Sequence, residues 1–453
     1  MKIARLLPRF RSIEKMLLPY AQREAWNRRQ IESYQLDAIN RIWSQAQQFN
    51  SYYQQLQSEH CLPSVFDSLE QYTDLFPVLE KSVVREFPEQ LLSSRKRPGA
   101  WRRTGGSTGV PTRVYWEQQA HLDALRSKYR CEQSHGLNVF DKRIFFWGHT
   151  GSYSPGVRGI AQKATLPIQD ALRSRMRVSA YDLSERALRL VLPKMVAYQP
   201  RVIYGYASAV LRLARIAKKH NHRFEHLKLI VLTAEPADCA MLDEVEQSLG
   251  AKAVMEYGSC ECGLMAYLMP DNQVHVREDQ VLIETLPNAS GTYDIVATLL
   301  NNPSFPMLRY RIGDTTSRPI QSPSQGFSIL SDVQGRDNDI IFSRDGKLLH
   351  SMAVKHIVEN YFGENRFLAV QDESGALEIT IESEHELPSK KQNRLLADME
   401  KRLDGFPVTV TTSAVIPGNL AGKHRWIIGK MAANGAPISA QRNATRTSIS
   451  SPE

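Results

Sequence analysis

Apolar positions in the first half of the chain recur at the spacing of amphipathic helices. The spacing predicts helices over 1–60, 184–198 and 207–220. A further helix is predicted around Leu122, Leu125 and Tyr129, which are spaced to share one face. Each of these helices needs an apolar surface to pack against.

Short apolar runs between the helices predict that surface as a set of buried strands. They are Val114–Trp116, Ile144–Trp147 and Leu227–Leu232. The last run, which ends in Leu229-Ile230-Val231-Leu232, is typical of a strand in a parallel sheet. Because such strands alternate with helices, the pattern predicts an α/β core.

The pattern changes after about residue 334. Gly335-Arg336-Asp337 is polar, and the elements predicted beyond it are a helix over 354–361, a strand over 376–382, a helix over 392–403 and a strand over 408–412. We therefore expect a large domain over 1–334 and a small α+β domain over 335–433. The Ser-, Thr- and Asn-rich segment 434–453 is predicted to be a disordered tail.

Composition agrees with a multidomain globular protein. The chain has 453 residues, 42% hydrophobic and 23% charged, and this length favours more than one core. Its five cysteines form no C-x-x-C pair and imply no disulfide framework, which favours a reducing cytoplasm. The apolar runs are too short to cross a bilayer. Charged residues near the N-terminus interrupt the apolar core that a signal sequence needs.

The net charge of +9 is concentrated near the N-terminus. Residues 1–30 carry eight Lys and Arg against two Glu, with apolar residues at roughly helical spacing. Such a segment either packs on its own domain, which we favour, or lies peripherally on an anionic membrane surface. No basic-aromatic motif accompanies the charge, so nucleic acid is not an expected partner. The oligomeric state is left open.

A compact loop, Thr104-Gly105-Gly106-Ser107-Thr108-Gly109, has the composition of an anion-binding turn. Its glycines allow close approach of the backbone to phosphate, and its hydroxyls donate hydrogen bonds. Five cations lie nearby at Arg95, Lys96, Arg97, Arg102 and Arg103. No Gly-Lys-Ser/Thr ends the loop and the G-x-G-x-x-G spacing is absent, so it is neither a Walker A nor a dinucleotide motif.

A second group of candidate residues follows the predicted strand 227–232. Ala234, Glu235 and Pro236 leave its carboxyl end, where α/β proteins bind ligands. In Glu256-Tyr257-Gly258-Ser259-Cys260-Glu261, the tyrosine suits stacking on adenine and Glu261 suits Mg²⁺ on phosphates. Next come Asp314, whose carboxylate suits a ribose diol, then Arg336, and near the chain's end Lys423 after two glycines.

In this order the motifs resemble those of the adenylate-forming superfamily of acyl-CoA synthetases. The closest resemblance is to the phenylacetate-CoA ligase branch and to capsular polysaccharide biosynthesis proteins of the CapK type. It covers about residues 30–430. It implies a large multi-layer α/β adenylation domain with a small mobile α+β domain.

The resemblance also implies a role for each matching residue. Thr104–Gly109 would grip phosphate, Ala234–Pro236 would lie beside adenine, and Tyr257 would stack on the base. Glu261 would hold Mg²⁺ and Asp314 the ribose. Arg336 would lie at the domain junction, with the hinge at Asp337 or Asp339, and Lys423 would serve the adenylation step. Three positions depart from the pattern: Val110 stands where Lys is usual, Cys260 where Thr is usual, and Thr233 where Gly is common.

The activity implied is that of an AMP-forming acid–thiol ligase. A small-molecule carboxylic acid attacks ATP, pyrophosphate leaves, and the acyl group passes to an acceptor, with CoA the expected one. Two anions meet in this reaction, so positioning and charge stabilisation dominate catalysis. Two alternatives stay open: acyl activation for a capsular or cell-surface polysaccharide without CoA, and a non-catalytic nucleotide-binding relative.

Two further features, a pair of aromatic segments and a group of cysteines, give weaker signals. Segments 147–150 and 204–207 resemble those flanking the family's acyl pocket, and their aromatic residues would suit a compact acid or a core equally well. Cys260, Cys262 and His275 form an incomplete zinc set, since structural zinc takes four ligands. We favour buried thiols there.

Overall fold

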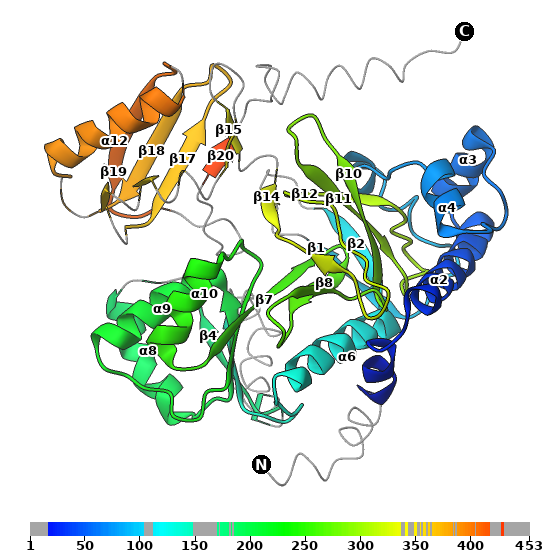
Figure 1. Cartoon of the computed structure of the whole chain (residues 1–453), viewed down its shortest axis with the longest axis horizontal. Coiled ribbons are helices and arrows are strands. Elements are labelled where there is room, and N and C mark those ends of the chain that lie inside the picture. The colour runs from blue at the N-terminus through cyan, green and yellow to red at the C-terminus, as the bar shows by residue number, and fades with distance from the viewer. Residues whose placement is uncertain are drawn as a thin grey trace, which may run out of the picture.

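The computed structural model of the chain (Figure 1) describes residues 17–103, 112–147, 170–171, 173–180, 183, 185–336, 340–342, 348–350, 354, 357–358, 361–362, 365–383, 385, 387–403, 405–416 and 427–429. The predicted phosphate loop Thr104–Gly109, the hinge aspartates Asp337 and Asp339, Lys423 and the predicted tail 434–453 lie outside these residues. The side chain of Arg336 also lies outside them, although its backbone is described.

Within the described residues, the largest sheet has eight strands in the order β13-β9-β8-β7-β6-β5-β3-β4. They are β3 (Arg143–Trp147), β4 (Arg175–Ser179), β5 (Val202–Tyr206), β6 (Leu229–Thr233), β7 (Lys252–Ser259), β8 (Gly263–Leu268), β9 (Val274–Val276) and β13 (Ile329–Leu330). Strands β4, β3, β5, β6 and β7 run parallel, and the sheet turns antiparallel from β7 onward. Every residue of β6 is buried, which confirms the predicted parallel strand.

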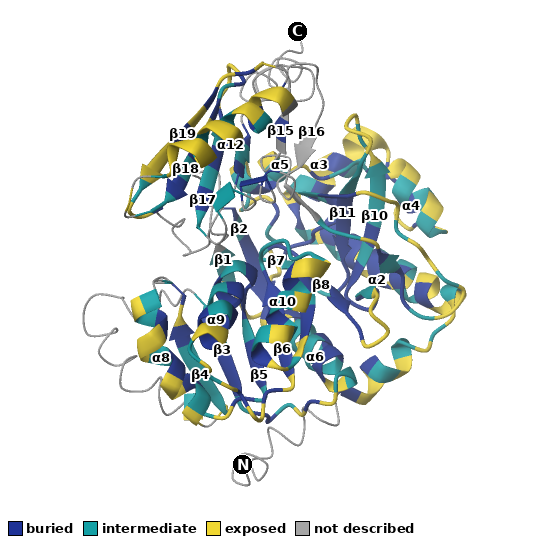
Figure 2. Ribbon diagram, turned by 60° about the vertical axis from the view of Figure 1, so that its left-hand side comes forward, coloured by how far each residue is buried: buried dark blue, intermediate teal, exposed yellow. Residues whose placement is uncertain are grey.

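Helices cover both faces of this sheet (Figures 1 and 2). On one face, α8 (Glu185–Ala197), α9 (Ala207–Lys219) and α10 (Cys239–Leu249) bury their apolar sides. On the other, α6 (Gln118–Ser134) contributes Cys131 to the cluster that contains Val231 and Val254. The central strands β5 and β6 are therefore buried on both sides, as a parallel sheet requires.

Helix α6 exists as predicted, and it buries a different face from the one that carries Leu122, Leu125 and Tyr129. Leu122 is exposed and Leu125 and Tyr129 are only partly buried, whereas Ala120, Ser127 and Cys131 are buried. Small side chains on that face let the helix lie close to the sheet. Close packing against the sheet, rather than hydrophobicity, therefore decides which face of α6 is buried.

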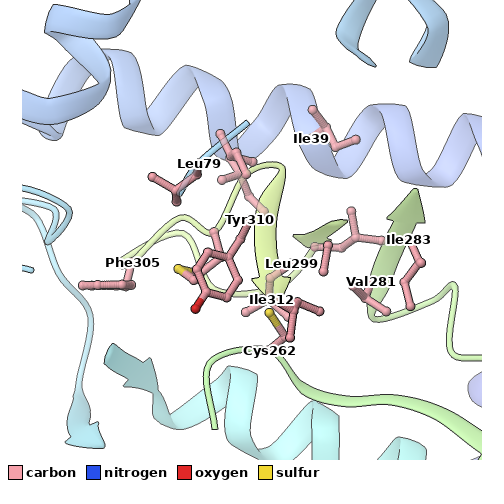
Figure 3. Close-up of a cluster of buried hydrophobic side chains, with 14 of the residues drawn as sticks. Ile39, Leu79, Cys262, Val281, Ile283, Leu299, Phe305, Tyr310 and Ile312 are labelled. Carbon is pink, nitrogen blue, oxygen red and sulfur yellow. The ribbon is translucent and has the colours of Figure 1, made fainter. Parts of the chain in front are cut away.

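A second part of the large unit joins N-terminal helices to an antiparallel sheet of four described strands, β10-β11-β12-β14. The strands are β10 (Val281–Pro287), β11 (Tyr293–Leu299), β12 (Tyr310–Thr316) and β14 (Gln334–Arg336). The helices are α2 (Arg28–Phe49), α3 (Ser51–His60), α4 (Leu69–Leu75) and α5 (Lys81–Glu86), and a hairpin is formed by β1 (Gly99–Arg103) and β2 (Arg113–Glu117). One core unites them, in which Ile39 of α2, Tyr310 of β12 and Cys262 before β8 belong to the same cluster (Figure 3).

The C-terminal part is a smaller α+β unit with its own core. Its sheet of four described strands has the order β19-β18-β17-β20 and carries α12 (Ser389–Arg402). The strands are β17 (Phe367–Gln371), β18 (Leu377–Glu382), β19 (Val408–Ser413) and β20 (Ile427–Gly429), with a short pair β15 (Ile340–Phe342) and β16 (Leu348–His350) beside them. Alternating burial along β18 confirms that predicted strand. A large α/β unit with a smaller C-terminal one is thus confirmed, while the boundary at 334 stays a prediction.

Residues 17–30 pack on the large unit. Leu17 and Tyr20 are buried, and Tyr20 donates a hydrogen bond to Asp123 of α6 at 3.0 Å. Arg28 forms an ion pair with Glu278 at 2.8 Å. These contacts favour the packed interpretation for this part of the basic segment. Within the described residues, no helix combines the length and apolar character that crossing a membrane requires.

A buried guanidinium connects this N-terminal segment to the sheets. The Arg277 side chain is fully buried, pairs with Glu24 at 2.8 Å and Asp279 at 3.6 Å, and donates to Ser127 Oγ of α6 at 2.9 Å. Asp279 is also fully buried, and burial raises its pKa while Arg277 lowers it. Each charge is therefore tolerable only while its partner is present.

We expect Arg277→Met to lower the free energy of unfolding by about 3–5 kcal/mol, because the buried Asp279 carboxylate then keeps only the more distant Arg23, at 3.8 Å, as a cation. Urea unfolding followed by tryptophan fluorescence measures this. The control is Lys219→Met, which breaks a pair with Glu185 in which the lysine side chain is 62% exposed, and it should leave the stability almost unchanged. Equal effects of the two variants would contradict the role of Arg277.

Candidate active site

The candidate site begins at the carboxyl ends of β6 and β7, which are parallel neighbours. Ala234 directly follows β6 and has a φ of 67°, an uncommon value for a residue with a Cβ. Glu235 follows it and accepts a hydrogen bond at 2.7 Å from the Ser208 backbone N–H, at the start of α9, where the helix leaves its amide groups unpaired. The segment predicted to lie beside adenine is therefore anchored to the sheet's helical layer, and its role toward a nucleotide stays a prediction.

Tyr257 and Asp314 meet although they lie on different sheets. The Tyr257 hydroxyl of β7 donates to Asp314 Oδ2 of β12 at 3.0 Å. Gly313, with a φ of 85°, and a register shift between Asp314 and Thr315 form an irregularity in β12 at this point. Irregularities of this kind re-aim a side chain out of the regular alternation. The structure thus brings two of the predicted nucleotide residues into direct contact.

Glu261 occupies the turn that follows β7 and is 1% exposed. Its Oε1 accepts hydrogen bonds from Lys81 Nζ at 3.2 Å and from the Tyr310 hydroxyl at 3.3 Å. Glu261 and Asp314 are linked through β12, which carries both Asp314 and the Tyr310 that donates to Glu261. From the other side, Tyr257 of β7 donates to Asp314 four residues before Glu261. The predicted metal carboxylate and the predicted ribose carboxylate therefore converge.

Lys81 was not predicted from the sequence. It is the first residue of α5 and lies 180 positions before Glu261. The preceding Leu79 exchanges backbone hydrogen bonds with Arg309 and Arg311, donating at 2.9 Å and accepting at 3.0 Å, which adds this segment alongside β12. That pairing places Lys81 next to Glu261.

The turn between β7 and β8 is built on two glycines. A Cβ at Gly258 would lie 2.5 Å from the Gly263 carbonyl oxygen, and one at Gly263, whose φ is +70°, would lie 2.7 Å from the Trp116 ring. Trp116 of β2 donates from Nε1 to the Cys260 carbonyl at 3.0 Å. The hairpin β1–β2, which frames the predicted phosphate loop, is thereby attached to the turn that carries Glu261.

The remaining predicted residues are placed only in part. Arg336 of β14 is the register partner of Asp314 on β12. The backbone of the residue predicted at the domain junction therefore lies next to Asp314. Lys423, the phosphate loop and Val110 lie outside the described residues. Their roles remain predictions.

The cations predicted to attract polyphosphate contact the protein's own side chains where they are described. Arg95 stacks on Phe49, Lys96 lies over the Tyr115 ring, Arg97 pairs with Glu117, and Arg102 stacks on Trp116. Arg102 also bonds His121 Nδ1 at 2.7 Å. These contacts stabilise the hairpin and the segment leading into it, and any effect on phosphate would be long-range.

An aromatic and charged group lies on the α6 side of the same sheet edge. Trp147 of β3 stacks on Tyr204 of β5, with ring centroids 5.7 Å apart and an interplanar angle of 18°. The Tyr204 hydroxyl donates to Glu256 Oε1 of β7 at 2.6 Å, and Lys128 Nζ of α6 lies 3.1 Å from Glu256 Oε2. Burial, and then the Glu256 carboxylate, raises the pKa of Tyr204 well above its ordinary value. The two segments expected to flank an acyl pocket therefore contribute neighbouring side chains.

The cysteines near the turn do not gather with His275. The His275 Nε2 lies 2.7 Å from Asp271 Oδ2, and the buried Cys262 thiol has a raised pKa, which disfavours the thiolate that zinc requires. Within the described part of the chain, no three His, Cys, Asp or Glu side chains group as a metal site.

Two known proteins are similar to this chain in sequence. No protein-family model matches the chain. Protein CapK of Staphylococcus aureus is 21% identical over 299 residues, and indoleacetate–lysine synthetase of Pseudomonas savastanoi is 22% identical over 300 residues. Each alignment covers 64% of this chain, and it covers 66% of CapK, just under two thirds, and 70% of the synthetase.

The whole fold is similar to that of a solved acid–CoA ligase. The crystal structure of 2-hydroxyisobutyryl-CoA ligase, in the postadenylation state with R3-HIB-AMP, superposes with a TM-score of 0.68 over 95% of this chain and 94% of the ligase, at 17% identity. The same ligase in the thioesterification state, with 2-HIB-AMP and CoA, gives a TM-score of 0.58. The chain therefore has the fold of an adenylate-forming acyl-CoA ligase. The resemblance drawn from the order of its motifs is thus confirmed.

In this adenylate-forming fold the Gly263 turn should be sensitive to the smallest side chain. We expect Gly263→Ala to lower the free energy of unfolding by about 2–4 kcal/mol, because the methyl group meets Trp116 in addition to the positive-φ strain. Gly291→Ala is the matched control, since Gly291 has a φ of +73° but nothing within 4 Å of the added Cβ.

Chemical denaturation of both variants separates the steric effect from backbone strain. Gly291→Ala should cost only about 1 kcal/mol. If the two variants are equally stable, Trp116 does not hold the turn as described.

Proposed function

We propose that the protein activates a carboxylic acid with ATP to form an acyl-AMP, with release of pyrophosphate, and then transfers the acyl group to an acceptor. The observation that carries this proposal is the convergence of Tyr257, Glu261 and Asp314 from two sheets. An aromatic ring, a carboxylate for a metal and a carboxylate for a diol are the groups that a nucleotide triphosphate needs in one place. The superfamily fold gives independent support.

In the proposed complex, Tyr257 stacks on adenine and Asp314 accepts hydrogen bonds from the ribose hydroxyls. The Tyr257–Asp314 hydrogen bond orients both side chains before the nucleotide arrives. Ground-state ordering of this kind reduces the entropy lost on binding. Ala234, Glu235 and Pro236, at the end of β6, are proposed to form the other side of the base site.

Magnesium fits the chemistry of Glu261. Mg²⁺ bound with ATP takes one or two protein carboxylates and completes its shell with phosphate oxygens and water. Glu261 provides one such carboxylate, and when bound there the ion would neutralise charge on the phosphates. Lys81 lies 3.2 Å from this carboxylate and adds a fixed positive charge at the same point. We propose that this charge takes the place of the lysine that the family pattern usually has at position 110, where this chain has Val.

Lys423 is proposed to act in the adenylation step from the small C-terminal unit. Its ammonium would stabilise the charge that develops between the acyl oxygen and the α-phosphate. Rotation of the small unit about Arg336 and the following residues would then remove the lysine and admit the acceptor, as in other hinge-gated enzymes. The phosphate loop Thr104–Gly109 would hold the leaving pyrophosphate.

CoA is the acceptor that we propose, because the ligase that shares the fold is crystallised with an acyl-adenylate and CoA. Transfer to an amine or to a capsular polysaccharide is the second candidate. It is favoured by the two curated relatives, one named as a synthetase joining indoleacetate to lysine and the other as CapK.

The central test is acid-dependent ATP–pyrophosphate exchange across a panel of carboxylic acids. At least one acid should support exchange, and Lys423→Ala should lower its rate about 10²- to 10³-fold because a transition-state charge is lost. ATP binding, measured by calorimetry, should change little. Lys219→Ala serves as the surface control. ATP binding without exchange for any acid would indicate a non-catalytic nucleotide-binding relative.

Lys81 gives a second test of the same site. We expect Lys81→Met to lower kcat/KM for ATP in the exchange assay about 100-fold, because one fixed charge near the phosphates is removed. Lys81→Arg should recover part of the loss. Lys391→Met, on the exposed face of α12, is the control.

Thermal unfolding of each variant is measured in parallel, since a buried Glu261 without its cation also destabilises the fold. A Lys81→Met protein that is destabilised but retains a normal KM for ATP and a normal rate would contradict the proposed role of Lys81.

A further inference from the structure

The ion pair between Glu256 and Lys128 is the strongest feature that the steps above do not use. Both side chains are largely shielded from solvent, with exposures of 9% and 14%. Glu256 is the last residue of β7 that pairs with the parallel strand β6, and it directly precedes Tyr257 of the proposed adenine site. Its register partner on β6 is Thr233, whose hydroxyl donates to Glu256 Oε1 at 3.4 Å.

The surroundings of this pair are aromatic. Tyr204 donates to Glu256 Oε1, and the Lys128 ammonium lies 3.1 Å from the centre of the Tyr204 ring. Trp147 stacks on Tyr204 and lies against Tyr206, with ring centroids 4.0 Å apart in the second contact. These residues come from β3, β5, β7 and α6 and meet at the carboxyl edge of the sheet. Ligands of open α/β sheets bind at that edge.

A structural ion pair at this position would stabilise the protein little. Removing two charges from water costs several kcal/mol per ion, and apolar replacements of such pairs are often neutral or stabilising. The pair is also incompletely satisfied. Within the described residues, Glu256 Oε2 accepts no hydrogen bond of good geometry, although Lys128 Nζ is 3.1 Å away. The Glu256 carboxylate has an unused acceptor oxygen beside the Lys128 ammonium. This arrangement suits a ligand group that both accepts a hydrogen bond from the ammonium and donates one to the carboxylate.

We propose that Glu256 and Lys128 recognise a hydroxyl group on the carboxylic acid, and that the protein is specific for hydroxylated acids; this inference rests on the proposed adenylation. A hydroxyl donates its hydrogen to the carboxylate and accepts one from the ammonium, so it pairs with both groups. An alkyl chain would satisfy neither. A substrate ammonium would pair with Glu256 but be repelled by Lys128. Trp147 and Tyr204 would contact the carbon skeleton.

Pairs of acids that differ by one hydroxyl test this specificity in the exchange assay. The pairs are 2-hydroxybutyrate and 3-hydroxybutyrate against butyrate, and mandelate and 4-hydroxyphenylacetate against phenylacetate, with 4-aminobutyrate as the ammonium probe. We expect at least one hydroxylated acid to exceed its deoxy partner about 100-fold or more in kcat/KM. Sites that bind a substrate hydroxyl with buried polar groups discriminate strongly against analogues that lack it.

Two variants separate recognition from stability. Lys128→Met should reduce the preference for the hydroxylated acid at least tenfold, and the double change Glu256→Leu with Lys128→Met should reverse it in favour of the deoxy acid. Lys142→Met is the matched control, because Lys142 also lies over a tyrosine, Tyr198, at 5.3 Å, on the opposite edge of the sheet. Glu244→Gln, which alters a part-buried pair with Arg215, is the carboxylate control. Both controls should keep the wild-type preference.

The outcomes distinguish this inference from the proposed function. Exchange with hydroxylated and deoxy acids at equal efficiency, or an unchanged preference in a folded Lys128→Met protein, would overturn hydroxyl recognition and leave adenylation intact. Exchange with no acid at all would contradict adenylation itself, and the inference would fall with it. If the double variant does not fold, the discrimination ratio of Lys128→Met alone decides.

Discussion

Two hydroxyl-to-carboxylate hydrogen bonds join the large sheet to the antiparallel sheet, and they run in opposite directions. Tyr257 of β7 donates to Asp314 of β12, and Tyr310 of β12 donates to Glu261 after β7. Each sheet thus supplies one tyrosine and one carboxylate to the same junction. The turn from Gly258 to Gly263 is tight enough to let this happen, and Trp116 of the β1–β2 hairpin closes over it. The candidate site depends on this junction more than on either sheet alone.

The proposed nucleotide would meet two carboxylates and one lysine at this junction. Carboxylates at Glu261 and Asp314 repel phosphate unless a cation intervenes, and Lys81 is positioned beside the more buried of the two. Elsewhere in the large unit, buried charges such as Arg277 and Asp279 are matched within the protein and bind the N-terminal segment to the sheets. The Glu256–Lys128 pair belongs to neither group, because it stands at the sheet edge with an acceptor still available.

The sequence predicted the parts of the structure that short-range patterns determine. The buried strand β6 was predicted from its apolar run, and β18 from alternation, because both signals arise within a few residues. A shared site for Tyr257, Glu261 and Asp314 was implied by the resemblance of the motif order to that of adenylate-forming enzymes. Lys81 was missed because a lone lysine far from Glu261 leaves no local signal; only the pairing of Leu79 with β12 places it. The buried face of α6 gives no signal in the apolar spacing, because it carries small residues such as Ala120, Ser127 and Cys131.

One complex would test the proposed nucleotide site most directly. A crystal structure of the protein with a non-hydrolysable acyl-adenylate analogue should show the adenine against Tyr257 and both ribose hydroxyls on Asp314. Glu261 and Lys81 should lie on the phosphate side of the same ligand. A nucleotide bound at a different edge of the sheet, with Tyr257 and Asp314 still bonded to each other and free of ligand, would contradict it.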